Sequence, residues 1–281
     1  PSTSEGEKTV TVTTAHGTTT TSAILVVGFY PVMSFRFDGS LVDDWDSSVA
    51  FESPYATPTW VSGTTYSSAV NRGSCGSIPI IGTTNRCPFY INAAGAAKTP
   101  SSTTYSGLKS NLTVAFRMRN ASTSGFTDSA NFNFAFVKER NEHALHQTAS
   151  DVYYGYHGVE GKGFYAAWLT SSSGDFGHSD WFGTFSGGLV NNYIFQVADT
   201  QGGFSTKLYQ EGNLLQTESY GTTNINRYAL AKTLGFNLDA NNNGYMDFIL
   251  IFNKVMTDFE VSKLNAVINN GTLYSHIFQH P

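Results

Sequence analysis

The chain has 281 residues, of which 40% are hydrophobic, 14% aromatic and only 13% charged. This apolar fraction can fill one large two-layer core, and all-β sandwiches of such length commonly form a single domain. The formal net charge is −5 and Lys and Arg are scattered singly, so nucleic acid is excluded as an expected partner because no basic surface would collect its phosphates.

The first 22 residues form a polar arm. Thr and Val alternate over Thr9–Thr13, a pattern typical of a β-strand, but these small β-branched residues distinguish neither face. A low-complexity Thr stretch covers 18–21, and the apolar run 23–32 predicts a buried strand. That run is about half the roughly 20 residues of a membrane-spanning helix, so we expect no membrane span. The expected parts are an arm with a first strand (1–32), able to act as a donor strand, and one sandwich domain (33–281).

From Met33 onward, short β-rich runs are separated by clusters of Gly, Asn, Asp and Ser. Several runs alternate between apolar and polar residues, as strands with one face in a sandwich core do, and 210–213 is a hairpin turn signal. This spacing favours a β-sandwich over alternating strands and helices. The runs cover 34–37, 112–118, 132–137, 163–169, 193–197, 205–209 and 245–252. The residues expected on one face of the last run are Met246, Phe248, Leu250 and Phe252.

One segment has helical periodicity. Thr257 is an N-cap residue with Glu260 three positions later, which forms a capping box, and apolar residues follow at 261, 264, 267 and 268. We predict a single helix over 257–268 that covers an open end of the sandwich. A final strand is expected over 272–278.

Three stretches resemble the laminin-G-like branch of the concanavalin A-like lectin/glucanase superfamily. Residues 33–44 are similar to its opening strand and Asp-bearing turn, and 193–215 to a pair of its strands. Residues 234–237 and 244–260 are similar to its closing strand and short helix. The resemblance spans roughly 33–270 and leaves the arm unexplained. It implies an all-β fold: a concanavalin A-like jelly-roll β-sandwich with one short C-terminal helix, here preceded by an extended N-terminal β arm.

The cysteines and glycosylation sequons favour an oxidising, extracellular setting. The two cysteines, Cys75 and Cys87, flank a short loop with Gly and Pro, which suits a local disulfide better than a zinc site, since zinc needs further soft ligands. Sequons begin at Asn111, Asn120 and Asn270, although an Asn- and Thr-rich chain also forms sequons by chance. We expect a secreted or cell-surface protein.

Calcium is the candidate cofactor. Residues 239–247 place oxygen-bearing side chains at alternate positions before a Gly, like the opening half of a calcium loop. The closing Glu is missing, because that position is Leu250, and an Asn- and Gly-rich hairpin would look the same. The candidate ligands are Asp239, Asn241, Asn243 and Asp247.

Two other clusters of metal-ligand residue types have ordinary explanations. An acidic turn at 43–46 is more often solvated than metal-bound. His143 and His146 are three residues apart, a spacing that would join them at one site on a helix, but they lie among predicted strands. Surface residues are the simpler interpretation of both.

A Gly- and Ser-rich loop is the candidate glycan site. It sets Trp181 and Phe182 beside His178 and Asp180, which combines a stacking ring with hydrogen-bonding groups suited to a sugar. The alternative is that Trp181 caps the edge of the core, and the same two interpretations apply to Trp45 and Trp60.

The sequence predicts no enzyme. A glucanase of the resembled fold needs two carboxylates that face each other from one strand, and no E-x-D-x-x-E run occurs. The nearest cluster, Glu139, Glu142 and Asp151, fits no such geometry. A glycoside hydrolase is therefore the least favoured function.

Two functions from different classes stay open. The first is a non-catalytic structural or adhesive subunit of a cell-surface or virion assembly, in which the Thr-rich arm adds to a neighbour's sheet and self-association gives a homo-oligomer or filament. The second is a lectin-like module that binds glycans, with or without calcium. Fold alone does not decide between them.

Overall fold

The structure is a computed structural model, and one strand-rich body makes up most of it. The described residues are 8–14, 17–23, 31–37, 39–52, 60–62, 74–77, 89–92, 111–119, 132–137, 152–159, 163–169, 176–178, 180, 182–184, 190–200, 203–221, 233–238 and 245–271.

An eight-stranded antiparallel sheet forms one layer of the sandwich. Its order is β15-β14-β13-β8-β17-β6-β5, with β3 also paired to β17. The bounds are β3 (Met33–Phe35), β5 (Trp60–Ser62), β6 (Ser74–Ser77), β8 (Leu112–Arg119), β13 (Val190–Thr200), β14 (Gly203–Gln210), β15 (Asn213–Gly221) and β17 (Tyr245–Phe252).

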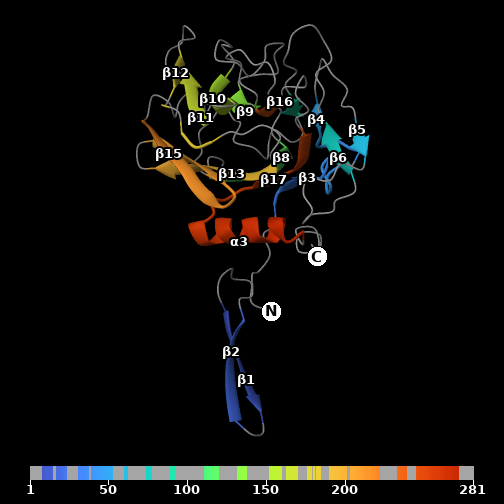
Figure 1. The fold of residues 1–281 in the computed structure, drawn as a ribbon, viewed down its shortest axis with the longest axis vertical. Coiled ribbons are helices and arrows are strands. Elements are labelled where there is room, and N and C mark those ends of the chain that lie inside the picture. The colour runs from blue at the N-terminus through green and yellow to red at the C-terminus, as the bar shows by residue number, and fades with distance from the viewer. Residues whose placement is uncertain are drawn as a thin grey trace.

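A seven-stranded antiparallel sheet forms the second layer, in the order β12-β11-β10-β9-β16-β7-β4. The bounds are β4 (Phe51–Glu52), β7 (Phe89–Ile91), β9 (Phe132–Val137), β10 (Val152–Val159), β11 (Gly163–Leu169), β12 (Phe176–His178) and β16 (Thr233–Leu238). Figure 1 shows the two sheets stacked face to face. The predicted all-β sandwich is therefore confirmed.

Aromatic side chains fill the space between the sheets. Phe116 of β8 and Tyr193 of β13 stack with ring centroids 5.4 Å apart, and Phe164 of β11 meets Tyr193 edge-on from the other layer at 5.6 Å. All three are at most 1% exposed. Burial of each such ring stabilises the fold by roughly 1.5–3 kcal/mol, so the inter-sheet core is the main source of stability.

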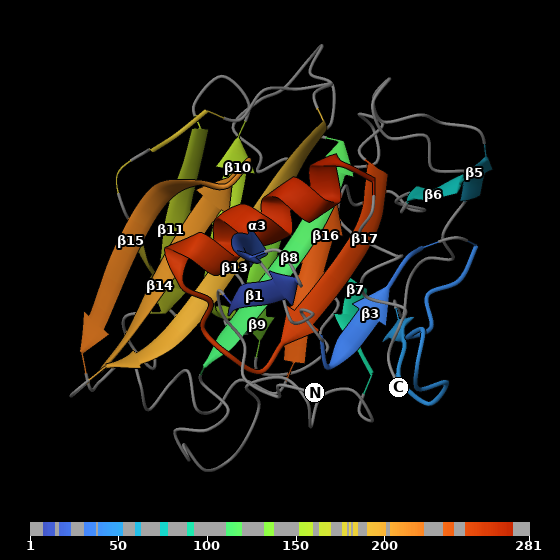
Figure 2. The ribbon, with the colours of Figure 1, turned by 90° about the horizontal axis from the view of Figure 1, so that it is seen from below.

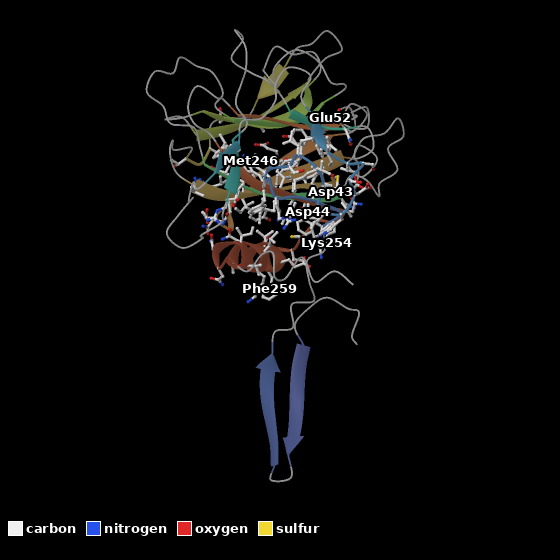
Figure 3. The ribbon with its side chains drawn as sticks, turned by 90° about the vertical axis from the view of Figure 1, so that its right-hand side faces the viewer. Asp43, Asp44, Glu52, Met246, Lys254 and Phe259 are labelled. Carbon is white, nitrogen blue, oxygen red and sulfur yellow. The ribbon has the colours of Figure 1, made fainter. Side chains whose placement is uncertain are left out.

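The single described helix, α3 (Asp258–Asn269), covers the outer face of the eight-stranded sheet (Figures 1 and 2). Its buried Val261, Leu264 and Ile268 pack in one cluster with the sheet residues Ala115, Ile194, Tyr209, Phe248, Leu250 and Phe252. The predicted helix is thus confirmed, but it lies across a sheet face and not over an open end of the sandwich. The opposite face of the helix is exposed, and Phe259 lies on it, half exposed (Figure 3).

The side chains of strand β17 do not all lie on the faces that the sequence pattern predicted. Met246, Ile249 and Ile251 belong to the inter-sheet core, whereas Phe248, Leu250 and Phe252 face α3. The register against β8 shifts between Met246 and Phe248, so Asp247 is an extra residue in the strand. A β-bulge of this kind reverses the alternation of side chains, which is why Met246 lies on the opposite face from the other three predicted residues.

The N-terminal arm forms a hairpin of its own. Strands β1 (Lys8–Thr14) and β2 (Gly17–Ala23) pair in a continuous register that runs from Thr14 opposite Gly17 to Lys8 opposite Ala23. The Thr stretch at 18–21 is therefore part of a second strand. The hairpin extends away from the sandwich on the side of α3 (Figures 1 and 3). The predicted buried strand 23–32 and the predicted final strand 272–278 lie largely outside the described residues.

Within the described part of the chain, no helix is long and apolar enough to cross a membrane.

Candidate functional site

The predicted calcium half-loop is described only at its end. Asp247 is the bulged residue of β17 and is fully buried, while Asp239, Asn241 and Asn243 lie outside the described residues. No group of three or more His, Cys, Asp and Glu side chains suited to a metal occurs among the residues that the structure describes. Calcium binding at 239–247 stays a prediction.

The acidic turn at 43–46, in which Figure 3 labels Asp43 and Asp44, is held by hydrogen bonds from Ser34 and Arg36. Asp43 Oδ1 accepts from the Ser34 backbone N–H at 2.9 Å. Asp44 accepts from the Ser34 hydroxyl at 2.7 Å and from Arg36 Nε at 2.8 Å. These bonds fasten the turn to β3, so the carboxylates of Asp43 and Asp44 serve the fold.

The candidate glycan loop is anchored on the sandwich. The backbones of Phe164 and Phe182 exchange hydrogen bonds of 2.8 and 2.9 Å, and their rings stack at 6.2 Å. Asp180, two residues earlier, is exposed. His178 ends β12, where its backbone pairs with that of Ala167, and Trp181 lies outside the described residues. The anchored loop therefore presents Asp180 to solvent.

The cysteines and sequons are partly described. Cys75 lies in β6 and Cys87 outside the described residues, so the disulfide stays a prediction. Asn111 Oδ1 accepts from the Asp199 N–H at 3.0 Å. Asn270 is the exposed C-cap residue of α3. Asn120 lies outside the described residues, as do the residues of the His143 and Glu139 clusters.

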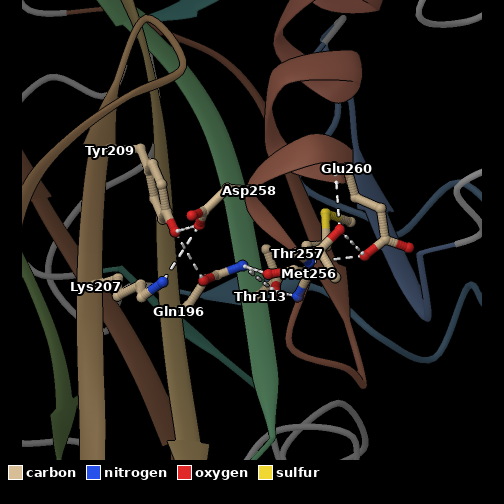
Figure 4. A network of polar contacts seen from close by, with 8 residues as sticks. All are labelled: Thr113, Gln196, Lys207, Tyr209, Met256, Thr257, Asp258 and Glu260. Carbon is tan, nitrogen blue, oxygen red and sulfur yellow. Dashed lines mark hydrogen bonds and ion pairs between the residues drawn. The ribbon is translucent and has the colours of Figure 1, made fainter.

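A buried polar network anchors the start of α3 (Figure 4). Thr113 Oγ1 donates to the Lys254 carbonyl at 2.7 Å and accepts from the Met256 N–H at 3.3 Å. Gln196 Nε2 donates to the Met256 carbonyl at 2.8 Å. The Thr257 and Glu260 capping box then begins the helix. The network satisfies backbone groups that would otherwise be buried without partners.

The same network ends in an ionisable group. The Tyr209 hydroxyl donates to Asp258 at 2.8 Å, and Lys207 Nζ lies 3.3 Å from the same oxygen. Burial, then the hydrogen bond to Asp258, raises the pKa of Tyr209 far above its ordinary value. The bonds from Tyr209 and Lys207 lower the pKa of Asp258. Tyr209 therefore stays a neutral hydrogen-bond donor, which suits an anchor and not an acid–base catalyst.

A second polar cluster joins the end of α3 to the β14–β15 turn. Glu211 Oε1 accepts from the Asn192 backbone N–H at 2.7 Å. Asn192 Nδ2 lies 2.8 Å from Asn269 Oδ1, 3.0 Å from Asn265 Oδ1 and 3.3 Å from Glu211 Oε2. Sequence patterns did not indicate this cluster, because its members are separated by as many as 77 positions. Only the turn signal at 210–213 pointed to one of its members.

The β1–β2 hairpin is the remaining surface of note. Among the described residues these strands pair only with each other, as a two-stranded sheet outside both layers of the sandwich. Each strand therefore has one long edge that no described strand covers.

Comparisons with known proteins give no family. No family model matches the chain, and no curated protein matches it. Solved structures with a similar fold include the botulinum neurotoxin type G receptor binding domain, at 8% identity and a TM-score of 0.47, with 85% of this chain and 52% of that chain covered.

A second similar structure is the binding domain of botulinum neurotoxin DC in complex with SialylT, at 11% identity and a TM-score of 0.44, with 85% of this chain and 51% of that chain covered. A third is Trypanosoma rangeli sialidase in complex with the inhibitor DANA, at 10% identity and a TM-score of 0.41, with 76% of this chain and 32% of that chain covered. The chain thus spans about half the neurotoxin domains and a third of the sialidase. At these identities and TM-scores the likeness assigns no function.

Proposed function

We propose that the chain is a non-catalytic, extracellular structural or adhesive protein that self-associates by adding the β1–β2 hairpin of one copy to that of another. The observation that carries this proposal is the hairpin itself, a two-stranded sheet that pairs with neither sheet of the sandwich among the described residues. An isolated two-stranded hairpin is at best marginally stable in water, so a partner that extends its sheet would stabilise it.

The hairpin lacks the usual protection of exposed edges. Proteins guard edge strands with charged residues, proline or bulges. Lys8 is the sole charged residue in Lys8–Thr14 and Gly17–Ala23, neither strand contains proline, and their register is unbroken. A second copy is the favoured partner because β2 has no charge to repel an identical strand. Since the hairpin has two edges, pairing at both would extend the assembly into a filament.

Proline substitution within β1 tests the proposal. Successive N–H groups of a strand point to opposite edges, so Thr11→Pro and Val12→Pro each remove one, either inside the hairpin or at its outer edge. We expect full-length protein to be oligomeric by light scattering and both variants to be mostly monomeric. Thr11→Val is the matched control, because it keeps the N–H group and the β-branched shape.

Two results would count against self-association through the hairpin. One is a monomeric full-length chain at about 1 mM, a concentration at which even interactions of about 4 kcal/mol are half saturated. The other is an oligomer whose mass is the same in both proline variants and in the Thr11→Val control.

Glycan binding is a second candidate function, favoured by the anchored loop that exposes Asp180 beside Trp181. A Trp181→Ala variant should lose retention on a glycan array, and Trp45→Ala, which removes a tryptophan that is 37% exposed, should not. Equal retention of Trp181→Ala and the unmodified chain would eliminate this loop as the binding site.

A further inference from the structure

The sandwich has one long sheet edge that no described strand covers. The outermost strands of its two sheets are β15 and β5 in one sheet and β12 and β4 in the other. Strands β5, β12 and β4 have only three, three and two residues, whereas β15 has nine and runs along the margin of its sheet (Figure 2). Very short outermost strands are one way in which proteins avoid further strand pairing, so β15 is the edge with room for another strand.

Alternate residues of β15 direct their backbone groups away from the sheet. Only two residues separate Thr200 of β13 from Gly203 of β14, its partner in the ladder, so these two form a hydrogen-bonded pair from which the alternation along β14 follows. The residues of β15 that bond β14 are therefore Gln216, Glu218 and Tyr220. The residues with outward N–H and C=O groups are Thr217, Ser219 and Gly221, and all three are exposed.

The outer edge of β1 has a matching arrangement. Thr14 and Gly17 are partners across a two-residue connection, so they too form a hydrogen-bonded pair. The β1 residues with outward backbone groups are therefore Thr9, Thr11 and Thr13. Outward residues lie opposite one another when two edges pair antiparallel, so these threonines would share a face with the outward residues of β15.

The other face of such a pair would continue the core of the sandwich. Val10 and Val12 alternate with the threonines of β1, so they would share a face with Tyr220, which belongs to the inter-sheet core. Apolar positions of β1 would then extend the apolar face of β15, and hydroxyl-bearing positions would extend the exposed face. The pattern of β1 is thus that of a further strand of the eight-stranded sheet.

Each of the two strands has one charged residue, and the charges are opposite. Lys8 is the charge in β1 and Glu218 the charge in β15. The Glu218 carboxylate accepts a hydrogen bond from Gln216 Nε2 at 2.7 Å, and none of the ion pairs among the described residues includes it. One antiparallel register, with Thr9 opposite Ser219, sets Lys8 diagonally across from Glu218. Long side chains span that separation of roughly 7–8 Å.

The other described strands with long free edges match β15 less well. A second β15 would bring two Glu218 side chains opposite or diagonal to each other in its central registers, and like charges there are destabilising. Strand β2 has no charged residue to offset Glu218. The charges therefore favour β1 as the partner of β15.

We propose that β15 is the sheet edge to which β1 of a second copy adds, antiparallel, by the strand addition that exposed sheet edges support. This inference rests on the proposed function, in which the hairpin joins the copies, and it names the partner of one hairpin edge. The β2 edge stays available for a second hairpin. A contact between two different surfaces repeats from copy to copy unless rotation closes a ring, so it suits growth of a filament.

Amide hydrogen exchange of full-length protein, resolved by residue over a dilution series, tests the role of β15. We expect Thr217, Ser219 and Gly221 to exchange rapidly in dilute protein and slowly in concentrated protein, in step with the outward amides of β1. Rapid exchange of these three at every concentration, while the hairpin amides become protected, would refute the role of β15 and leave hairpin association intact. Rapid exchange of both sets would refute both proposals, and protection of β15 that does not depend on concentration would mean pairing within one chain.

A proline in β15 tests the outward backbone groups. Ser219→Pro removes an N–H group that the β14–β15 ladder does not use, a position at which edge strands tolerate proline. We expect its mass by light scattering to fall well below that of Ser219→Ala, which keeps the N–H group, while both variants keep the unfolding temperature of dilute unmodified protein to within a few degrees. Equal masses of the two variants would show that β15 is not the acceptor strand.

Exchange of the two charges tests the partner and needs no proline. Lys8→Glu and Glu218→Lys each replace an attraction by a repulsion, so each should weaken association about fivefold, and the double variant should restore it. Glu218→Lys combined with Lys263→Glu on α3 has the same net charge as that double variant and should stay weak. The pairing of β1 with β15 is wrong if the first double variant associates no better than the single variants, or if the second restores association equally.

Discussion

Thr113→Val should detach the start of α3 from the sheet. Thr113 is fully buried in β8, and its hydroxyl bonds the Lys254 carbonyl at 2.7 Å and the Met256 N–H at 3.3 Å (Figure 4). Valine has nearly the same shape but no hydroxyl, so packing is kept while the buried Met256 N–H and the partly buried Lys254 carbonyl lose the Thr113 hydroxyl. The buried Met256 N–H left without this partner costs about 1–3 kcal/mol, and the partly buried Lys254 carbonyl adds about 1 kcal/mol, which gives an expected loss of about 2–4 kcal/mol.

Equilibrium unfolding in guanidinium chloride measures this loss, and amide hydrogen exchange shows whether it is concentrated in Asp258–Asn269. Thr113→Ser is the control. It keeps the hydroxyl and removes one methyl group, so it should cost only about 1 kcal/mol. If the valine variant is no less stable than the serine variant, the hydrogen bonds of Thr113 do not anchor the helix and the reasoning is wrong.

Two more predictions concern packing and pH. A Cβ at Gly203 would overlap the carbonyl oxygen of Tyr220, whereas a Cβ at Gly221, the residue paired with Gly203, would meet nothing within 4 Å. Gly203→Ala should therefore lower the free energy of unfolding by about 1–3 kcal/mol or more, and Gly221→Ala should lower it much less. Thermal unfolding of the two variants measures the difference. Burial acts to raise the pKa of Glu260, but the bonds from Lys254 and the helix cap outweigh it and lower that pKa. The stabilisation from Glu260 is therefore present above its ordinary pKa and is lost as the pH falls through the lowered folded-state value, so Glu260→Gln should flatten the acid side of a plot of unfolding temperature against pH.

Local signals in the sequence predicted their elements well. The α3 boundary followed from Thr257 and Glu260, because a capping box involves contacts over three positions only. The turn at 210–213 was likewise a local signal. In contrast, the bulge at Asp247 depends on pairing with β8, which lies more than a hundred positions earlier, and no local sequence pattern predicts it. The alternation expected along β17 therefore failed at Met246.

The candidate sites likewise differ in whether a local sequence pattern predicts them or distant segments form them. The Thr-rich stretch that forms β2 has no apolar alternation, so its strand became evident only through its pairing with β1. The cluster around Asn192 consists of amides and one carboxylate from three distant segments, and none of them forms a motif with its neighbours in sequence. The motif-based sites, at 239–247 and around Trp181, lie mostly outside the described residues.

Hydrogen exchange over Lys8–Ala23, measured in dilute and in concentrated full-length protein, tests self-association most directly. In a lone hairpin about half of the amides point outward and exchange rapidly, because strand N–H groups alternate between the two edges. We predict that the outward amides become protected as the concentration rises, in step with the mass measured by light scattering. Rapid exchange of these amides at every concentration would contradict the proposed assembly.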